Sequence, residues 1–213
     1  GSFSGTTAGL YTAPATLTGA ETVTVKATLA DGTSGTATVN LSTGTTGGGA
    51  TATFVPPPDT TTGGSWEGVY GSDGTALAGV TPQNVPSYAT FALQNQITYT
   101  WASTTTDPRA LQTGVGTGRI AAAWYNPATF SLDVNFTDGG THQFALYAVD
   151  WDSSNRTETI QVVDAATNNQ LDVETLSNFT NGVYLVWKIS GHVKINVTKT
   201  GSSNALINGV FFK

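Results

Sequence analysis

The sequence predicts an all-β protein, a β-sandwich or jelly roll that follows a shorter segment of strands. Only 10% of the 213 residues are charged, against roughly 25% in ordinary globular chains, so the residues that usually cover exposed helical faces are scarce. Thr, Ser, Asn and 25 Gly must supply most of the polar surface, which suits short strands and tight turns. Apolar and polar residues alternate in several short runs, and no amphipathic helix pattern interrupts them.

Residues 53–213 are predicted to form one large β domain. In residues 130–136 every second side chain is apolar, which is the pattern of a half-buried strand, and residues 192–198 repeat it. Turn sequences such as Asp138-Gly139-Gly140 separate the runs. Strands at this spacing pack as a sandwich or jelly roll with mostly antiparallel pairing. The predicted strands are 88–93, 97–101, 119–124, 130–136, 143–149, 158–164, 183–189, 192–198 and 205–212, and residues 107–113 have room for one short helical turn.

Residues 1–43 are predicted to form a separate strand segment. Val23, Val25 and Ala27 alternate with polar residues, and after a glycine-containing turn the alternation resumes in residues 36–41, as in a β-hairpin. Residues 44–52 consist of Gly, Thr and Ala and are predicted to be a flexible linker. Three consecutive prolines at 56–58 then stiffen the beginning of the larger domain.

The strand segment resembles the C-terminal half of a bacterial immunoglobulin-like domain, on the strength of residues 9–15, 21–25 and 37–41. About forty residues cannot bury a stable sandwich core alone. The partial immunoglobulin-like segment is therefore expected either to dock on the larger domain or to be completed by another chain.

The larger domain resembles the galactose-binding-like β-sandwich modules of secreted multidomain bacterial proteins, which include many carbohydrate-binding modules. The resemblance is carried by residues 144–152, by Arg156 and Glu158, by residues 182–187 and by the closing strand 204–212. It implies a secreted, extracellular or cell-surface location and a glycan partner. It supports the fold more than the ligand, because this fold hosts unrelated functions.

Composition narrows the classes of partner. The net charge is −6 and the eight Lys and Arg residues are scattered, so neither nucleic acid nor an anionic membrane surface fits as a partner. Cysteine is absent, which excludes disulfides and thiolate metal sites. No apolar run of about 18 residues is present, so membrane insertion is not expected.

Sugar recognition needs flat apolar rings beside polar groups, because pyranose C–H groups stack on the rings and the rim binds hydroxyls. Trp151 follows a strand in a polar loop, and Trp66 and Tyr70 lie in a glycine-flanked segment; we expect the rings of Trp66 and Trp151 to face solvent. Trp101 and the pair Trp124-Tyr125 are further candidates, although each tryptophan can instead fill a core. For Trp187 the core is the expected place.

The loop after residue 149 is the most informative part of the chain, since Trp151 is accompanied there by Asp150, Asp152 and Arg156. Asp150, Asp152 and Ser154 place oxygen ligands at alternate positions, which is a spacing that can bind Ca²⁺. An EF-hand loop would also need Gly and Glu at its sixth and twelfth positions, which here are Asn and Gln. The alternative is that an aspartate pairs with Arg156 and caps the turn. No other cofactor is expected.

The sequence predicts a non-catalytic carbohydrate-binding module rather than an enzyme. There is no nucleophile elbow and no phosphate-binding glycine loop, and no spacing favours a catalytic carboxylate pair. The alternative is a structural or adhesive surface protein, in which residues 1–43 self-assemble by adding strands to one another.

Overall fold

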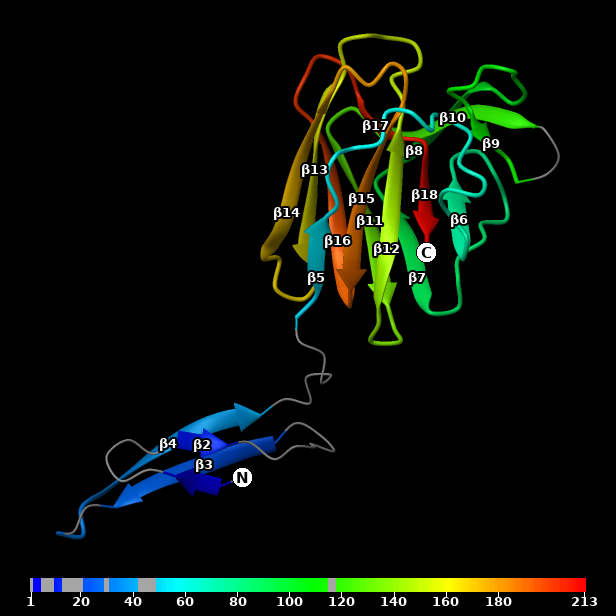
Figure 1. Cartoon of the computed structure of the whole chain (residues 1–213). Coiled ribbons are helices and arrows are strands. Elements are labelled where there is room, and N and C mark those ends of the chain that lie inside the picture. The colour runs from blue at the N-terminus through cyan, green and yellow to red at the C-terminus, as the bar shows by residue number, and fades with distance from the viewer. Residues whose placement is uncertain (1, 5–9, 13–20, 29–30, 42–48, 115–117) are drawn as a thin grey trace. The chain divides into compact units, whose positions relative to one another are not determined.

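The computed structural model describes residues 2–4, 10–12, 21–28, 31–41, 49–114 and 118–213 (Figure 1). Every regular element among these residues is a strand, which confirms the all-β prediction. The described residues include no helix long and apolar enough to cross a membrane. The chain divides into two units, residues 1–48 and residues 49–213, and each is described separately.

The described residues of the first unit form two antiparallel strand pairs. Strand β1 (Ser2–Ser4) pairs with β2 (Leu10–Thr12), and β3 (Glu21–Thr28) pairs with β4 (Ser34–Leu41). The predicted hairpin is therefore present, and in its turn the side chain of Asp31 accepts a hydrogen bond from a backbone amide two residues later. The likeness to an immunoglobulin half-domain stays a prediction.

Sheet I of the second unit has the strand order β14-β13-β16-β11-β7, with antiparallel pairing throughout. Its strands are β14 (Gln170–Ser177), β13 (Thr157–Asp164), β16 (His192–Lys199), β11 (Thr129–Phe136) and β7 (Ala89–Gln94). In the neighbouring strands β11 and β16, the alternation of apolar residues read from the sequence matches the observed alternation of burial, except that Ser131 of β11 is also buried.

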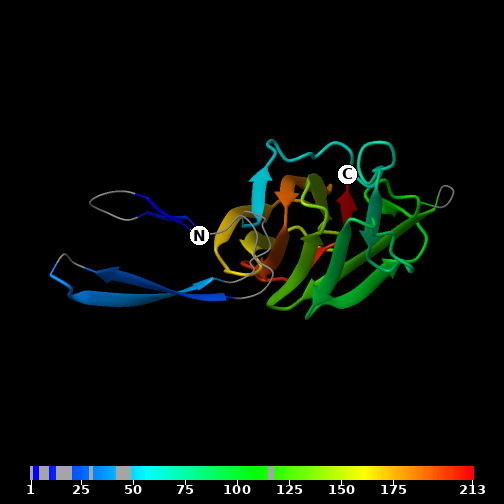
Figure 2. The same ribbon diagram turned by 90° about the horizontal axis from the view of Figure 1, so that it is seen from below.

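Sheet II has the strand order β5-β15-β12-β18-β6 and is also antiparallel. Its strands are β5 (Thr51–Phe54), β15 (Val183–Ser190), β12 (Thr141–Ala148), β18 (Gly209–Phe212) and β6 (Gly74–Leu77). Figure 2, which looks along the strands, shows the cyan, orange and red strands β5, β15 and β18 in one layer and green strands in the facing layer. The second unit is thus a β-sandwich.

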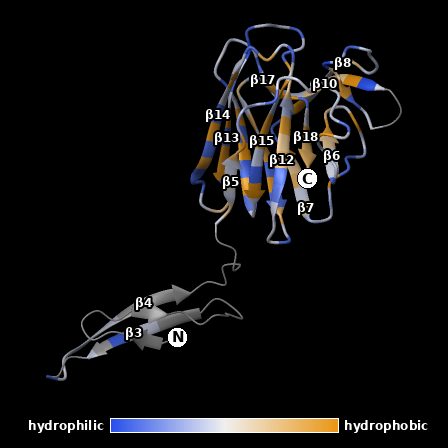
Figure 3. Ribbon diagram, viewed as in Figure 1, coloured by the Kyte–Doolittle hydropathy of each residue, from blue (hydrophilic) through white to orange (hydrophobic). Residues whose placement is uncertain are grey.

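The main core lies between sheets I and II. Val193, Ile195 and Val197 of β16 are fully buried, and they pack in one cluster with Leu146 and Trp187 of sheet II. Hydrophobic colouring accordingly follows the strands of this unit, whereas most loops are polar (Figure 3). The expectation that Trp187 belongs to the core is confirmed.

A second core covers the outer face of sheet II. Strands β12 and β15 each bury five consecutive residues, so both of their faces are covered, which simple alternation does not predict. The outer face carries Tyr147, Tyr184 and Phe211, and the segment with Trp66 and Tyr70 packs on these rings.

Sheet III is smaller and has one face on the main core. It comprises β17 (Ala205–Ile207), β10 (Arg119–Asn126) and β8 (Ile97–Ala102) in that order, and the short strand β9 (Leu111–Gln112) also pairs with β10. Trp124 of β10 points into the main core. The opposite face of sheet III carries the site described below.

The predicted strand 205–212 is in fact two strands, β17 in sheet III and β18 in sheet II. The chain changes sheet at Asn208, whose buried side chain donates to the carbonyl of Ala122 at 2.7 Å and accepts from the amide of Val149 at 2.7 Å. Because an apolar environment makes unpaired amides costly, this asparagine, bonded at both its amide nitrogen and its amide oxygen, fixes the switch point between the two sheets.

Four strands of the second unit were not predicted: β5, β6, β9 and β14. Strand β5 begins at Thr51, within the residues predicted to be a linker. Residues 107–110 form one hydrogen-bonded turn, from the amide of Ala110 to the carbonyl of Asp107, and not a helix. Strand β14 has only one buried residue, Leu176, so its sequence lacks a clear apolar face.

Gly182 permits the turn that leads into β15. Its φ is +86°, and a Cβ at this position would lie 1.9 Å from the hydroxyl oxygen of Tyr147. Both the left-handed backbone and the clash oppose any side chain. We expect Gly182→Ala to lower the free energy of unfolding by about 2 kcal/mol or more in urea denaturation. Gly139 also has a positive φ, but no atom lies within 4 Å of the position that a Cβ would take, so Gly139→Ala should cost about 1 kcal/mol. Equal costs would contradict the role given to Tyr147.

Candidate functional site: an aromatic pocket on sheet III

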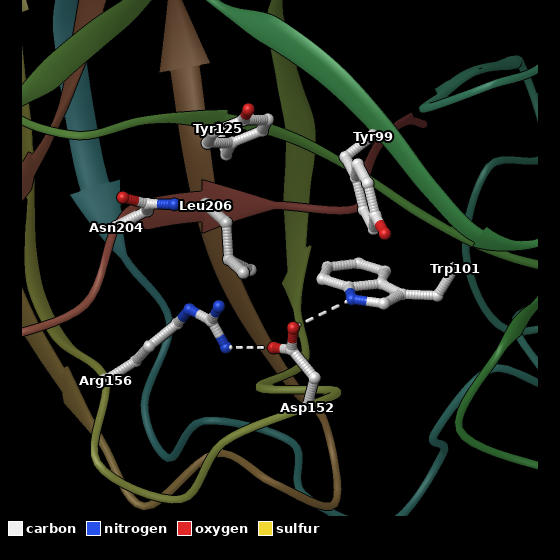
Figure 4. A pocket seen from close by; sticks show the side chains of 7 residues that line it. All are labelled: Tyr99, Trp101, Tyr125, Asp152, Arg156, Asn204 and Leu206. Carbon is white, nitrogen blue, oxygen red and sulfur yellow. Dashed lines mark hydrogen bonds and ion pairs between the residues drawn. The ribbon is translucent and has the colours of Figure 1, made fainter.

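The outward face of sheet III gathers three aromatic rings. Tyr99 and Trp101 are two residues apart on β8 and therefore share a face, and Tyr99 pairs with Ala123 of β10. Tyr125 follows two residues later on the same face and pairs with Leu206 of β17. The sheet III pocket, of about 190 Å³, is lined by Tyr99, Trp101, Tyr125, Asp152, Arg156, Asn204 and Leu206 (Figure 4).

Asp152 joins the aromatic side of this pocket to its basic side. Its Oδ2 accepts a hydrogen bond from the indole Nε1 of Trp101 at 2.9 Å, and its Oδ1 accepts one from Nη1 of Arg156 at 2.7 Å (Figure 4). Partial burial would raise the pKa of Asp152, but these two partners outweigh it and lower the pKa below its ordinary value. At neutral pH an ionised carboxylate therefore holds the Trp101 ring in place.

Asp150 shapes the loop from behind the pocket. It is 1% exposed and pairs with the buried Arg156 guanidinium. Its carboxylate also accepts hydrogen bonds from Ser153 Oγ and from the Arg156 backbone amide. This is the turn-capping ion pair that the sequence offered as the alternative to calcium.

Trp151 lies beside the pocket without lining it. Its ring centroid is 6.4 Å from that of Trp101, with the two planes 30° apart. The guanidinium of Arg109 lies 4.5 Å from the Trp151 ring centroid and is itself held by Asp107 at 2.8 Å. Arg109 therefore covers one face of this half-buried indole, and the residue also packs against the second core.

The prediction that Trp66 faces solvent is wrong. The residue is 8% exposed, its ring packs 5.3 Å from that of Phe211, and its Nε1 donates to the carbonyl of Gln112 at 2.8 Å. Tyr70 belongs to the same second core: it stacks on Tyr184 at 4.2 Å, and its hydroxyl donates to Asp59 at 2.9 Å. The aromatic outer face of sheet II needs a cover, and these side chains provide it, so the structure does not bring them to the sheet III pocket.

Trp124 is also buried, at 4% exposure, and its neighbour Tyr125 lines the pocket instead. Adjacent residues on a strand face opposite sides, so the choice between them depends on which face of β10 meets the core. The sequence did not reveal this. Tyr99 was also missed, although the sequence contained a signal for it. The Tyr-x-Trp spacing of β8 places Tyr99 on the same face as Trp101.

The calcium ligation predicted for Asp150 and Asp152 stays a prediction. Both oxygens of Asp150 are occupied by Ser153 and Arg156, and the described residues form no group of three His, Cys, Asp or Glu side chains able to hold a metal ion.

No protein-family model and no curated protein matches the chain. Among solved structures, the chain is similar to TmCBM61 in complex with β-1,4-galactotriose, with 10% identity, 60% of this chain and 88% of that chain covered, and a TM-score of 0.32. It is also similar to a structure from a study of the promiscuous specificity of carbohydrate-binding modules of the β-sandwich superfamily, with 10% identity, coverage of 88% and 74%, and a TM-score of 0.20. Since both scores are low, the function proposed next rests on the residues of the site.

Proposed function

We propose that the second unit is a non-catalytic carbohydrate-binding module and that the sheet III pocket is its binding site. One observation carries the proposal: Tyr99, 52% exposed, and Trp101 present rings beside the ion-paired Asp152 and Arg156. Soluble proteins rarely leave aromatic rings grouped at the surface without a use, and rings beside fixed polar groups match the alternating C–H and hydroxyl surface of a sugar.

Several polar groups of the pocket are available to ligand hydroxyls. The hydroxyls of Tyr99 and Tyr125 and the amide of Asn204 make no side-chain hydrogen bond to another described residue, and all three side chains line the pocket. In the pocket the charge of Asp152 is balanced by Arg156, Asp150 adds a second carboxylate behind the pocket, and the chain carries a net charge of −6. The local field therefore favours a neutral glycan over an acidic one.

The pocket also favours binding over hydrolysis. Glycoside hydrolysis needs two carboxyl groups across the bond to be cleaved. Among the described residues that line the pocket, Asp152 supplies the only carboxylate. A secreted or cell-surface location and membership of a larger protein are part of the proposal, because insoluble or extracellular glycans are the natural targets of such a site.

Assembly through residues 1–43 is the alternative role expected from the sequence. Each described strand there has one antiparallel partner within the unit, β1 with β2 and β3 with β4, and its other edge could still accept a strand. The described residues offer no observation that favours strand addition over glycan binding.

The proposal is tested by retention of the full chain on insoluble polysaccharides and on an array of neutral and acidic glycans, with and without EDTA. We expect retention by at least one neutral glycan, competition by its soluble oligosaccharides, and no change with EDTA, because Asp150 is already occupied by protein donors. Absence of retention on every neutral glycan would contradict the proposal. Loss of retention in EDTA would restore the calcium hypothesis.

A further inference from the structure

A buried carboxyl group lies directly behind the sheet III pocket. Glu158, on β13, is 0% exposed. Its Oε2 accepts a hydrogen bond of 2.8 Å from the backbone amide of Leu206, a pocket residue on β17. Its Oε1 has no hydrogen-bond partner. One half of this carboxyl thus fixes the β17 wall of the pocket, and the other half is unpaired.

Arg156 presents the complementary group. It precedes Glu158 by two residues, so the two side chains leave an extended segment on the same side. Nη1 of Arg156 donates to Asp150, Asp152 and Ser153, whereas the buried Nε has no partner. An unpaired buried donor on the pocket-lining Arg156 and an unpaired buried acceptor on Glu158 behind the pocket are therefore placed two residues apart in the sequence.

The charged groups around Glu158 are few. Arg156 and Asp150 act on it from its own side of the sheet, Arg156 favouring and Asp150 opposing its ionised form. Glu158 is paired in register with Lys199 on β16 and with the apolar Leu176 on β14. On β17, the backbone amide of Leu206 donates to its carboxyl group. Burial outweighs the two favourable partners and raises the pKa of Glu158 to about 8, so the carboxyl is largely neutral at pH 6 and ionised at pH 9.

We propose that Glu158 is a positioning residue of the sheet III pocket, acting on the ligand face through Leu206 and through the chain Arg156–Asp152–Trp101. The inference rests on the proposed function. While Glu158 is neutral, Arg156 is held by Asp150 and Asp152, and Asp152 in turn holds the Trp101 indole. Ionised Glu158 attracts the guanidinium through the free Nε and draws it away from Asp152, which loosens Trp101.

The test compares the full wild-type chain with Glu158→Gln between pH 6 and pH 9, using an oligosaccharide of the glycan that the chain retains. Gln keeps an acceptor for the Leu206 amide and mimics the neutral carboxyl. Wild-type affinity should fall about fivefold over this range, the effect of weakening one ionic hydrogen bond, with a midpoint near pH 8. Glu158→Gln should match the wild type at pH 6 and stay flat.

Glu174→Gln is the matched control. Partial burial also raises the pKa of Glu174, with Asp172 adding to the effect, but it lies on β14 and does not line the pocket. This variant should retain the wild-type pH dependence. A fall in affinity that persists in Glu158→Gln, or one that disappears in Glu174→Gln, would overturn the proposal.

A ligand-free measurement separates this inference from the proposed function. In wild-type ¹H–¹⁵N spectra, the Leu206 amide and the Trp101 indole should titrate together near pH 8. If they do so while no glycan is retained at any pH, the proposed function fails and the positioning role stands. If glycan is retained but the Trp101 indole does not follow the Leu206 amide, the positioning role fails. This measurement needs no variant, so it holds even if Glu158→Gln does not fold.

Discussion

Trp101→Ala is expected to reduce affinity for the retained glycan by at least about tenfold, as loss of a central aromatic contact does in other interfaces. The substitution removes the stacking face and leaves the Asp152 carboxylate without its indole donor. Because Trp101 is only partly buried and packs against the main core without being one of its buried residues, the melting temperature should fall less than it would for a fully buried tryptophan. Affinity is measured by calorimetry with a soluble oligosaccharide.

Two controls separate stacking from hydrogen bonding and from general damage. Trp101→Phe keeps a ring but removes the Nε1 donor, so it should fall between the wild type and Trp101→Ala. Trp66→Phe removes the Nε1 hydrogen bond to Gln112 in the second core, so it should cost about 1 kcal/mol of stability and leave glycan affinity unchanged. Weaker binding by Trp66→Phe, together with unaltered binding by Trp101→Ala, would contradict the sheet III assignment and indicate a binding site on the outer face of sheet II.

Asp150→Ala is expected to lower the free energy of unfolding by about 3 to 5 kcal/mol, because it leaves the buried Arg156 charge without its closest partner. It also removes the acceptor for Ser153 and for the Arg156 amide, which shape the 150–156 loop. Urea denaturation followed by tryptophan fluorescence measures the loss.

Asp152→Ala is the matched comparison. This carboxylate forms an ion pair with the same guanidinium, but its side chain is 47% exposed, so its loss should cost less than about 1 kcal/mol of stability. It should nevertheless weaken glycan binding, since Trp101 loses its anchor. If the two variants lost equal stability, the division between a structural Asp150 and a ligand-facing Asp152 would be wrong.

Much of the sandwich was readable from alternation alone. Strands β11, β13, β15 and β16 were predicted to within about one residue at each end, because each has a regular apolar face that meets the main core. Strand β14 was missed because an edge strand buries little and carries polar residues on both faces. The break at Asn208 was missed because the change of sheet depends on hydrogen bonds to β10 and to the residue after β12.

The site was predicted in part. Trp101, Asp152 and Arg156 do meet, and the capping role foreseen for the aspartates describes Asp150. The outer aromatic face of sheet II was not foreseen, and Trp66 was therefore expected to face solvent, and Tyr70 to bind a ligand, whereas the two rings pack on Phe211 and Tyr184. The local sequence shows that an aromatic side chain is present, but not whether another part of the protein covers it, because that depends on contacts between segments far apart in the sequence.

The five tryptophan indoles offer the most direct test of the binding site. Their N–H signals can be followed separately in ¹H–¹⁵N spectra while an oligosaccharide of the retained glycan is added. The Trp101 signal should shift most, and those of Trp66 and Trp187, bonded to Gln112 and Asp172 inside the protein, should stay in place. Saturable binding that leaves Trp101 unmoved, or that shifts Trp66 instead, would contradict the assignment of sugar recognition to the sheet III pocket.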